Sequence, residues 1–295
     1  MIEVLQNIID GLGRGSIYAL LALGVALVFG VMHLLNFAHG EMITVSGFVA
    51  YWTLNHGWSW YLVAPLIVVT AIVTSLVIER VAFSRVRGSS DFTLLLTSFG
   101  VHFVVSAAFI LYVSASVKTF SRPGWVTNTY SIGSLHIEVY DTVVIGVTLV
   151  TLLGTTWIVQ RTMFGLALRA AAADFDTARL MGVRSDSVIR GAFGLAGLLA
   201  GIAGVFWLMQ RGSTTPSAGI TPMLKGVLAA LIGGLGSLRG AVLGGLVLGL
   251  AEVLLRTRLP DSVAGLTEGA VFVLIALLFI FRPGGLISVA HAERV

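Results

Sequence analysis

Long apolar runs separated by short polar connections fill most of this 295-residue chain. A membrane-spanning helix needs about 20 mostly apolar residues, because each residue adds about 1.5 Å along the helix axis. The runs cover residues 9–32, 42–56, 61–79, 92–113, 142–159, 190–208, 223–236, 240–256 and 265–281. The pattern predicts an all-α polytopic membrane protein with about eight or nine transmembrane or re-entrant helices, built from residues 1–295 as a single domain.

Two regions depart from this pattern, because glycine and polar residues interrupt the apolar runs at 33–56 and 223–256. Irregular backbone at membrane depth must be covered by protein or line a cavity, and paired broken helices often line a substrate route. We therefore expect the translocation path to include Asn36, His39, Gly40 and Glu41. A second interpretation stays open, in which these residues only cap a helix break and satisfy its free backbone groups.

Small residues recur at helical spacing within several runs. Gly11 and Gly15 stand four residues apart, a spacing that lets two membrane helices approach closely. The run at 190–208 is also rich in glycine. The glycines that we assign to helix packing are Gly11, Gly15, Gly197, Gly201, Gly236 and Gly240.

The longest polar and charged segment in the chain is 165–187. Strong helix formers without proline up to Met181 predict one short helix, and Gly182 stands where a helix end favours positive φ. Asp176 and Arg179 are three residues apart and are expected to pair on the exposed face of this helix. A short helix between two spans, with small residues that admit a partner closely, is suited to docking. The alternative is an ordinary solvated loop, or an amphipathic helix resting on lipid.

Composition and charge placement fix the setting of these elements. Hydrophobic residues make up 57% of the chain, charged residues only 11%, and the mean hydropathy is +0.97, whereas soluble domains have about 25% charged residues. Three arginines fall in 79–91 and five in 160–190. Because basic loops face the cytoplasm, these connections and the C-terminus are predicted to be cytoplasmic and 114–141 external. The basic residues therefore indicate topology in a lipid bilayer rather than nucleic-acid binding.

The sequence lacks common motifs for hydrolytic catalysis, metal binding and nucleotide binding. It contains no cysteine and no GxSxG, HExxH or GxxxxGK[ST] pattern. His39 and Glu41 would diverge by about 200° on a helix, so a shared metal ion is not expected. The lone His102 is expected to be a packed, hydrogen-bonded residue. We therefore expect a non-enzymatic chain that binds no metal and no cofactor; if ATP powers it, another chain must hydrolyse the ATP.

Two other functions are compatible with parts of the pattern. A stand-alone secondary carrier or channel for a small solute would need buried carboxylates for a coupling ion, and only Glu41 and Glu252 are candidates. Glu252 stands near the end of an apolar run, where an interfacial position is the default. An intramembrane enzyme would need a nucleophile with a base, or paired aspartates within the spans, and neither is found.

Several segments together resemble one known family. RAAAADFDTARLMGV at 169–183, followed by AGIAGV at 200–205, is similar to permease subunits of bacterial ATP-binding cassette (ABC) importers for branched-chain amino acids. GSIYALLALG at 15–24 and NFAHGE at 36–41 look like the LivH-type member of the permease pair, and GGLGSLRG at 233–240 resembles the C-terminal half. The resemblance covers nearly the whole chain.

The resemblance implies a function and a set of partners. The chain would be a permease in the bacterial cytoplasmic (inner) membrane that moves leucine, isoleucine, valine or related small polar solutes delivered by an external binding protein. Two ATP-binding cassette subunits would bind the ATP, and a second permease, either a paralogue or a copy of this chain, would complete the importer. In the family, the segment corresponding to 165–187 is a cytoplasmic coupling helix that docks into the ATP-binding subunit. The residues carried over to this docking role are Arg169, Ala173, Asp174, Ala178, Arg179 and Gly182.

Overall fold

The computed structural model of this chain describes residues 2–32, 34–133, 135–259, 267–281 and 285–287. Within this part of the chain, six helices are long and apolar enough to cross a membrane. They are α1 (Ile2–Met32), α3 (Trp60–Val81), α4 (Asp91–Tyr112), α5 (Val139–Arg161), α8 (Ser185–Arg211) and α10 (Leu238–Arg258). Shorter apolar helices accompany them: α2 (Glu41–Asn55), α9 (Ile220–Gly233) and α11 (Thr267–Phe281). The prediction of an all-α polytopic membrane protein is confirmed.

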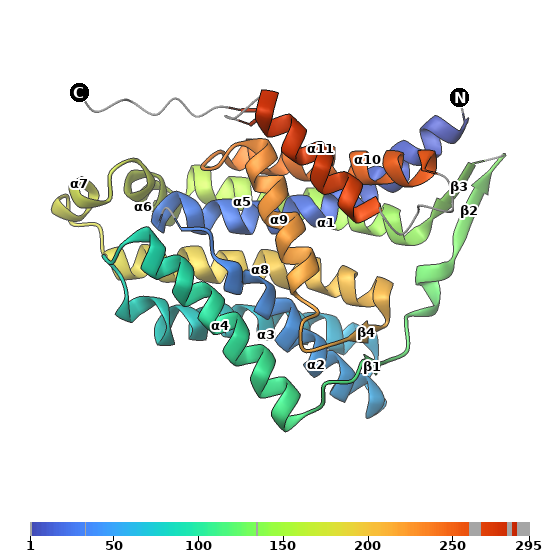
Figure 1. The fold of residues 1–295 in the computed structure, drawn as a ribbon, viewed down its shortest axis with the longest axis horizontal. Helices are drawn as coiled ribbons and strands as arrows, with labels where there is room; N and C mark the ends of the chain where they lie inside the picture. Colours follow the sequence, from blue (N-terminus) through green and yellow to red (C-terminus); the bar gives the residue numbers. More distant parts are fainter. Residues whose placement is uncertain (1, 33, 134, 260–266, 282–284, 288–295) are drawn as a thin grey trace.

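The remaining elements gather mainly at two ends of the helical body (Figure 1). One end, here called the basic end, carries the short helices η2 (Phe83–Arg85), α6 (Met163–Ala173) and α7 (Phe175–Leu180). The other, the hairpin end, carries β1 (Lys118–Thr119), η3 (Gly124–Thr127), β2 (Thr129–Ile132), β3 (Leu135–Glu138) and β4 (Ser213–Thr214). β2 and β3 form an antiparallel hairpin, and β1 pairs antiparallel with β4.

Contacts at the two ends agree with the grouping of loops predicted from arginine placement. Arg87, in the α3–α4 connection, forms an ion pair with Asp186 at the start of α8, so the two arginine-rich connections lie together. At the other end, the Gln6 side chain donates to the His136 carbonyl oxygen over 2.7 Å. The N-terminal part of α1 therefore lies at the hairpin end. The last residues, 288–295, predicted to be cytoplasmic, lie outside the described residues.

α1 and α8 form the centre of the molecule, and 83% of the apolar window of each is buried. α1 runs from the hairpin end to the basic end, and α8 runs in the opposite direction (Figure 1). Each is followed by a break in helical structure, a short helix and two further helices. α1 packs against α10 of the other half, and α8 packs against α3 in the same way. Residues 2–112, the first half, and 185–281, the second half, therefore form an inverted structural repeat.

The two breaks meet inside the protein. The first consists of residues 34–36 and the 3₁₀ helix η1 (Phe37–Gly40), and the second comprises 212–219. Gly40 and Gly219 are the N-cap residues of α2 and α9. A Cβ atom on Gly219 would lie only 1.9 Å from the carbonyl oxygen of Gly40. No side chain fits there, so glycine at both positions allows the two backbones to cross.

Glycines also bring the long helices together. A Cβ on Gly15 would lie 2.8 Å from the Cα of Leu246 in α10. In the other half, a Cβ on Gly201 would lie 2.8 Å from the Cα of Val68 in α3. The same close approach is found at the other glycines predicted to pack, namely Gly11, Gly197 and Gly240.

Gly236 is an exception to the predicted packing role. It adopts a φ of +87° in the α9–α10 turn, and a Cβ there would meet nothing within 4 Å. Glycine is therefore required at position 236 by the backbone conformation, which favours a residue without a side chain, and not by helix packing.

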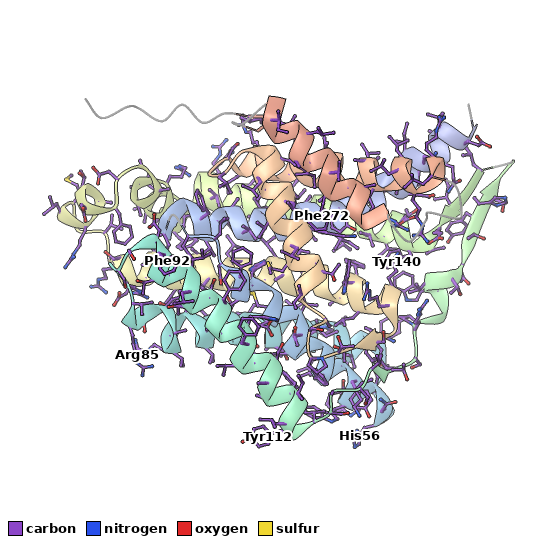
Figure 2. All side chains as sticks on the ribbon, in the orientation of Figure 1. His56, Arg85, Phe92, Tyr112, Tyr140 and Phe272 are labelled. Atoms are coloured by element: carbon purple, nitrogen blue, oxygen red, sulfur yellow. The ribbon has the colours of Figure 1, made fainter. Side chains whose placement is uncertain are left out.

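The outer helices present apolar side chains to the surroundings. Phe92 and Tyr112 on α4 are 71% and 87% exposed, whereas Tyr140 on α5 is buried (Figure 2). Only 11% of the apolar window of α4 and 22% of that of α5 is buried. Such faces suit a lipid environment, in which exposed apolar side chains carry no penalty.

Candidate functional site

The polar segment at the basic end consists of two helices, not the single helix predicted from the sequence. α6 ends at Ala173, and Asp174 is in an extended conformation with φ of −156°. Its side chain accepts hydrogen bonds from the backbone N–H groups of Asp176 and Thr177, both 3.1 Å long. Asp174 is therefore the N-cap of α7, a role for which aspartate is strongly preferred. The predicted helix end is confirmed, since Gly182 has φ of +88°.

The residues predicted to dock a partner do not all face outward. Arg169 donates a hydrogen bond to the carbonyl oxygen of Val159, which ties α6 to the end of α5. Ala178 is buried, whereas Ala173, Arg179 and Gly182 are exposed. Arg169 and Ala178 therefore help to hold the segment in place, but Arg169 is also exposed, so it lies with Ala173, Arg179 and Gly182 on a surface that a partner could reach.

The tip of α7 carries two exposed apolar residues that the sequence analysis did not single out. Leu180 is 87% exposed and Met181 is 82% exposed. α7 projects beyond the helical body at the basic end (Figure 1). Their position just before Gly182, at the end of a polar segment, could have identified them from the sequence.

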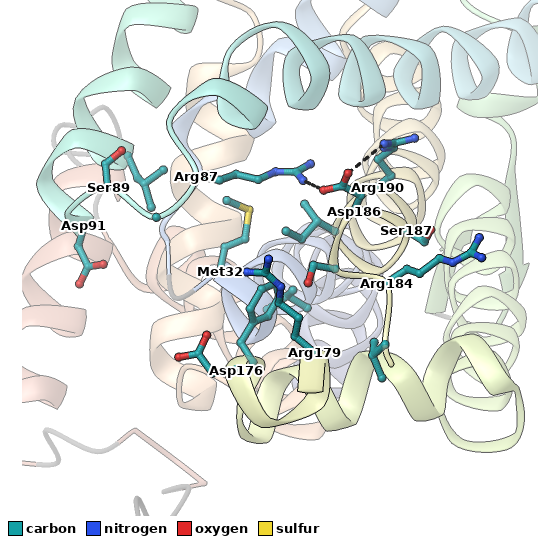
Figure 3. A pocket seen from close by; sticks show the side chains of 17 residues that line it. Met32, Arg87, Ser89, Asp91, Asp176, Arg179, Arg184, Asp186, Ser187 and Arg190 are labelled. Carbon is teal, nitrogen blue, oxygen red and sulfur yellow. Dashed lines mark hydrogen bonds and ion pairs between the residues drawn. The ribbon is translucent and has the colours of Figure 1, made fainter. Parts of the chain in front are cut away.

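A cavity of about 870 Å³ lies beside α7, between the α3–α4 connection and the start of α8. Figure 3 shows Arg87 reaching across it to Asp186, which also faces Arg190 at 3.6 Å. Arg87 pairs in addition with Glu79 of α3, whose side chain is fully buried. The predicted pair of Asp176 and Arg179 is not formed among the described ion pairs; both side chains line the cavity instead.

The first break holds the polar residues that were predicted to line a path. The Asn36 side-chain oxygen accepts from the backbone N–H of Ala38 over 3.0 Å, so Asn36 caps the break. Asn36 and His39 are each 1% exposed and Glu41 is 0% exposed. These residues therefore face the interior of this chain, and none of them lines the cavity beside α7.

Glu41 has a partner that is far away in the sequence. His102 Nδ1, on α4, lies 2.5 Å from Glu41 Oε1. The expectation that His102 is packed and hydrogen bonded is confirmed. Within the described residues, the second oxygen of Glu41 and both ring nitrogens of His39 have no hydrogen-bond partner. The His39 ring packs against Gly24, where a Cβ would lie 2.9 Å from its Cε1 atom.

α4 covers both breaks, although most of its surface is exposed. Phe99 stacks on Phe37 in the first break, with ring centroids 4.4 Å apart. About two turns further along α4, the Ser106 hydroxyl donates to the carbonyl oxygen of Pro216 in the second break over 2.8 Å. Together with His102, these contacts join α4 to the meeting point of the two halves.

A second buried polar cluster was missed by the sequence analysis. Lys225 Nζ, on α9, lies 2.9 Å from both carboxylate oxygens of Glu252 on α10 and 3.0 Å from the hydroxyl oxygen of Tyr18 on α1. The Tyr18 hydroxyl also donates to Glu252 over 2.8 Å. Glu252, expected near the end of a span, is only 7% exposed and therefore faces the interior of the protein.

These pairings bear on the alternatives to a permease. Both carboxylates proposed as ligands of a coupling ion, Glu41 and Glu252, already pair with His102 and Lys225. Across the described residues, no group of three or more histidine or acidic side chains could hold a metal ion. No observation therefore favours a stand-alone carrier.

Comparison with known proteins gives a consistent result. Residues 7–281 match a family described as the permease component of branched-chain amino acid transport systems. The high-affinity branched-chain amino acid transport system permease protein BraD of Pseudomonas aeruginosa is 31% identical, over 99% of this chain and 98% of that protein. The corresponding LivH protein of Escherichia coli K12 is 30% identical, over 99% of this chain and 97% of that protein. A solved structure of a transporter assigned to the metal-chelate ABC type, in an inward-facing conformation, has a TM-score of 0.49 at 18% identity, over 93% of this chain and 82% of that one.

Proposed function

We propose the function of this chain from one premise: it belongs to the permease components of branched-chain amino acid transport systems. It acts as a transmembrane permease subunit of an ABC importer and carries leucine, isoleucine, valine or related small polar solutes handed over by an external binding protein. The chain has no catalytic role. Separate ATP-binding cassette subunits bind and hydrolyse the ATP.

The observation that carries this proposal is the apolar tip of α7. Leu180 and Met181 are almost fully exposed at the basic end, next to the exposed Arg179. Large apolar side chains that project from a polar segment mark a protein contact. The tip of α7 therefore inserts into a groove of the ATP-binding subunit, and Arg179 pairs with an acid at the rim.

The contacts around the cavity explain how a movement of α7 on docking is transmitted to the transmembrane helices. Arg87 links Asp186 at the start of α8 to the buried Glu79 of α3. α8 has 27 residues, which at about 1.5 Å per residue reach about 40 Å, the full depth of a bilayer. A displacement of α7 is therefore passed along α8 to the second break, where Gly219 touches Gly40.

The translocation path opens where the two breaks separate. The N-termini of α2 and α9 meet there, and helix N-termini favour the carboxylate end of an amino acid. Asn36, His39, Gly40 and Glu41 line this part of the route when the breaks move apart. Their burial in the present conformation corresponds to a closed path.

The basic end is cytoplasmic in this proposal, and the hairpin end meets the binding protein. The orientation rests on the arginine-rich connections at 79–91 and 160–190. A second permease, either a paralogue or a copy of this chain, pairs with it in the membrane.

The test is reconstitution with the ATP-binding subunits, the second permease and the binding protein in liposomes. Replacement of both Leu180 and Met181 by glutamine should lower leucine uptake and leucine-stimulated ATP hydrolysis by about thirtyfold or more, because two interface anchors of more than 1 kcal/mol each together contribute more than about 2 kcal/mol. Met163→Gln is the matched control, since Met163 is 80% exposed on α6 at the same end. Full coupling in the double variant would refute the docking role, and leucine uptake by this chain alone without ATP would refute the permease function.

A further inference from the structure

The cluster of Lys225, Glu252 and Tyr18 lies between three helices of both halves. Arg14 joins it at its margin, with Nη1 3.5 Å from Glu252 Oε1. Lys225 Nζ also lies 5.2 Å from the centroid of the Tyr18 ring. The cluster contains cationic and anionic groups side by side, held by hydrogen bonds of 2.8 to 3.0 Å.

Polar side chains connect this cluster to the hairpin end. Asn7, Arg14 and Tyr18 follow one another at intervals of seven and four residues, so they share one face of α1. Asn7 donates to the hydroxyl of Thr257 on α10 over 3.4 Å. Arg14 is still 29% exposed at the side chain. These polar side chains form a row, here called the polar track, from the hairpin end to the level of α9, and Gly11 and Gly15 in the same stretch of α1 hold it closed against α10.

The inverted repeat shows that the fold itself does not need these charges. Ser46 occupies the same place in α2 that Lys225 occupies in α9, counted from the first residue of each helix. Ser46 bonds only to backbone oxygens, those of Met42 and Ile67. Ionisable residues at membrane depth are costly, face partners or water-filled cavities, and commonly mark substrate pathways. We therefore expect the charged residues of the second half to have a functional role.

We propose that Lys225 and Glu252, assisted by Tyr18 and Arg14, bind the two charged ends of a zwitterionic α-amino acid as it crosses the half of the membrane next to the hairpin end. The ammonium group of Lys225 takes the carboxylate of the solute, and the carboxylate of Glu252 takes its ammonium group. Before entry the two side chains neutralise each other, and after entry each is neutralised by the solute. The net charge of the site is the same in both states, so no unpaired charge is exposed to the membrane interior. This inference rests on the proposed function.

The decisive variant replaces both members of the pair. Lys225→Met combined with Glu252→Leu removes both charges, and a buried ion pair replaced by apolar residues commonly leaves a protein as stable as before. In the reconstituted importer we expect unchanged thermal unfolding and basal ATP hydrolysis, with leucine uptake reduced about tenfold or more, the loss expected for hydrogen bonds to charged groups. The matched control is Ser46→Ala with Ser75→Ala, which removes two buried hydroxyls of the first half. It should leave leucine uptake close to that of the importer without substitutions.

The outcomes separate this inference from the proposed function. If the unchanged importer takes up leucine with ATP and the double variant does so equally well, the pair has only a structural role and the inference is refuted. If the unchanged importer takes up no leucine, the proposed function itself fails.

Accessibility of the polar track gives an independent measurement. The chain contains no cysteine, so a single introduced cysteine can be followed in the assembled importer. Asn7→Cys should react with a charged, water-soluble methanethiosulfonate reagent. Addition of a saturating amount of leucine-loaded binding protein during turnover should slow this reaction. Leu254→Cys is the control, because Leu254 is 44% exposed on α10 and stands about 200° around the helix from Glu252. Equal reactivity at both positions, or none at position 7, would contradict a water-accessible track.

Discussion

In the first half of the molecule α1 leads through a break into α2, and in the second half α8 leads through a break into α9 in the opposite direction. The two breaks meet at Gly40 and Gly219, each the N-cap of its short helix. Long-helix packing repeats as well, with α1 against α10 and α8 against α3. The geometry of the two halves is therefore closely similar.

Their polar chemistry differs at corresponding places. α2 begins with Glu41, which pairs with His102, whereas α9 begins with the apolar Ile220. Further along, α2 has Ser46 where α9 has Lys225. Glu41 and Glu252 are therefore buried carboxylates at different levels and with different partners, and the first half holds a further one, Glu79, which pairs with Arg87.

The difference separates what the fold requires from what function adds. Close backbone contacts at glycines, such as Gly15 against Leu246 and Gly201 against Val68, recur in both halves and define the shared geometry. Charged groups do not recur, so they are not needed to build the repeat. Variants at corresponding positions can therefore test which features carry stability.

The largest difference in unfolding free energy is expected between variants of Glu252 and of Glu41. Glu252→Leu leaves the ammonium group of Lys225 buried without its anion, which should cost about 3–5 kcal/mol of unfolding free energy. Glu41→Leu removes the hydrogen bond to His102 and should cost about 1–2 kcal/mol. Denaturant unfolding of the purified protein measures both values.

Adding Lys225→Met to Glu252→Leu should restore most of the lost stability, because the buried ammonium group is then removed and Arg14, which also loses Glu252, is 29% exposed at the side chain. Equal costs for the two single variants would contradict the view that the halves differ in charge burial.

The next largest effect is expected where the two breaks cross. Gly219→Ala places a Cβ against the Gly40 carbonyl group and should cost about 1–3 kcal/mol, since backbone must move to admit it. Gly146→Ala on α5 is the control, because a Cβ there meets nothing within 4 Å and alanine favours a helix by about 0.5–1 kcal/mol. Thermal unfolding of both variants checks the contrast. A harmless Gly219→Ala would mean that the breaks do not need their close contact.

Features of this molecule that depend on local sequence could be predicted, and those that depend on distant partners could not. The apolar runs predicted the spans, and glycine with polar residues predicted the irregular backbone near Asn36. The position of Gly182 predicted its positive φ. Each of these signals acts within a few residues, through burial, turn conformation or hydrogen bonding.

The pairing of Lys225 with Glu252 has no such local signal. The two residues lie on different helices, and Glu252 near the end of an apolar run suggested an interfacial position. The inverted repeat is also hidden, because apart from the glycines at the two N-caps, corresponding places such as Ser46 and Lys225 hold different residues. In contrast, the division of the 165–187 segment was foreseeable, since Asp174 is a strong N-cap residue in the middle of the predicted helix.

The smallest effect is expected at Ser46, the counterpart of Lys225. Its hydroxyl donates to the carbonyl oxygens of Met42 and Ile67, over 2.6 and 3.2 Å. Helical carbonyl groups keep their backbone hydrogen bonds when this hydroxyl is removed, so Ser46→Ala should cost about 0.5–1 kcal/mol. Lys225→Ala should cost several times more, because it takes away the nearer cation of the buried Glu252 carboxylate and leaves only the longer contact with Arg14 at 3.5 Å. Thermal unfolding of the two variants side by side measures the ratio. Equal losses would mean that position within the repeat, rather than charge, determines stability, and the functional reason for the charged cluster would then lose its main support.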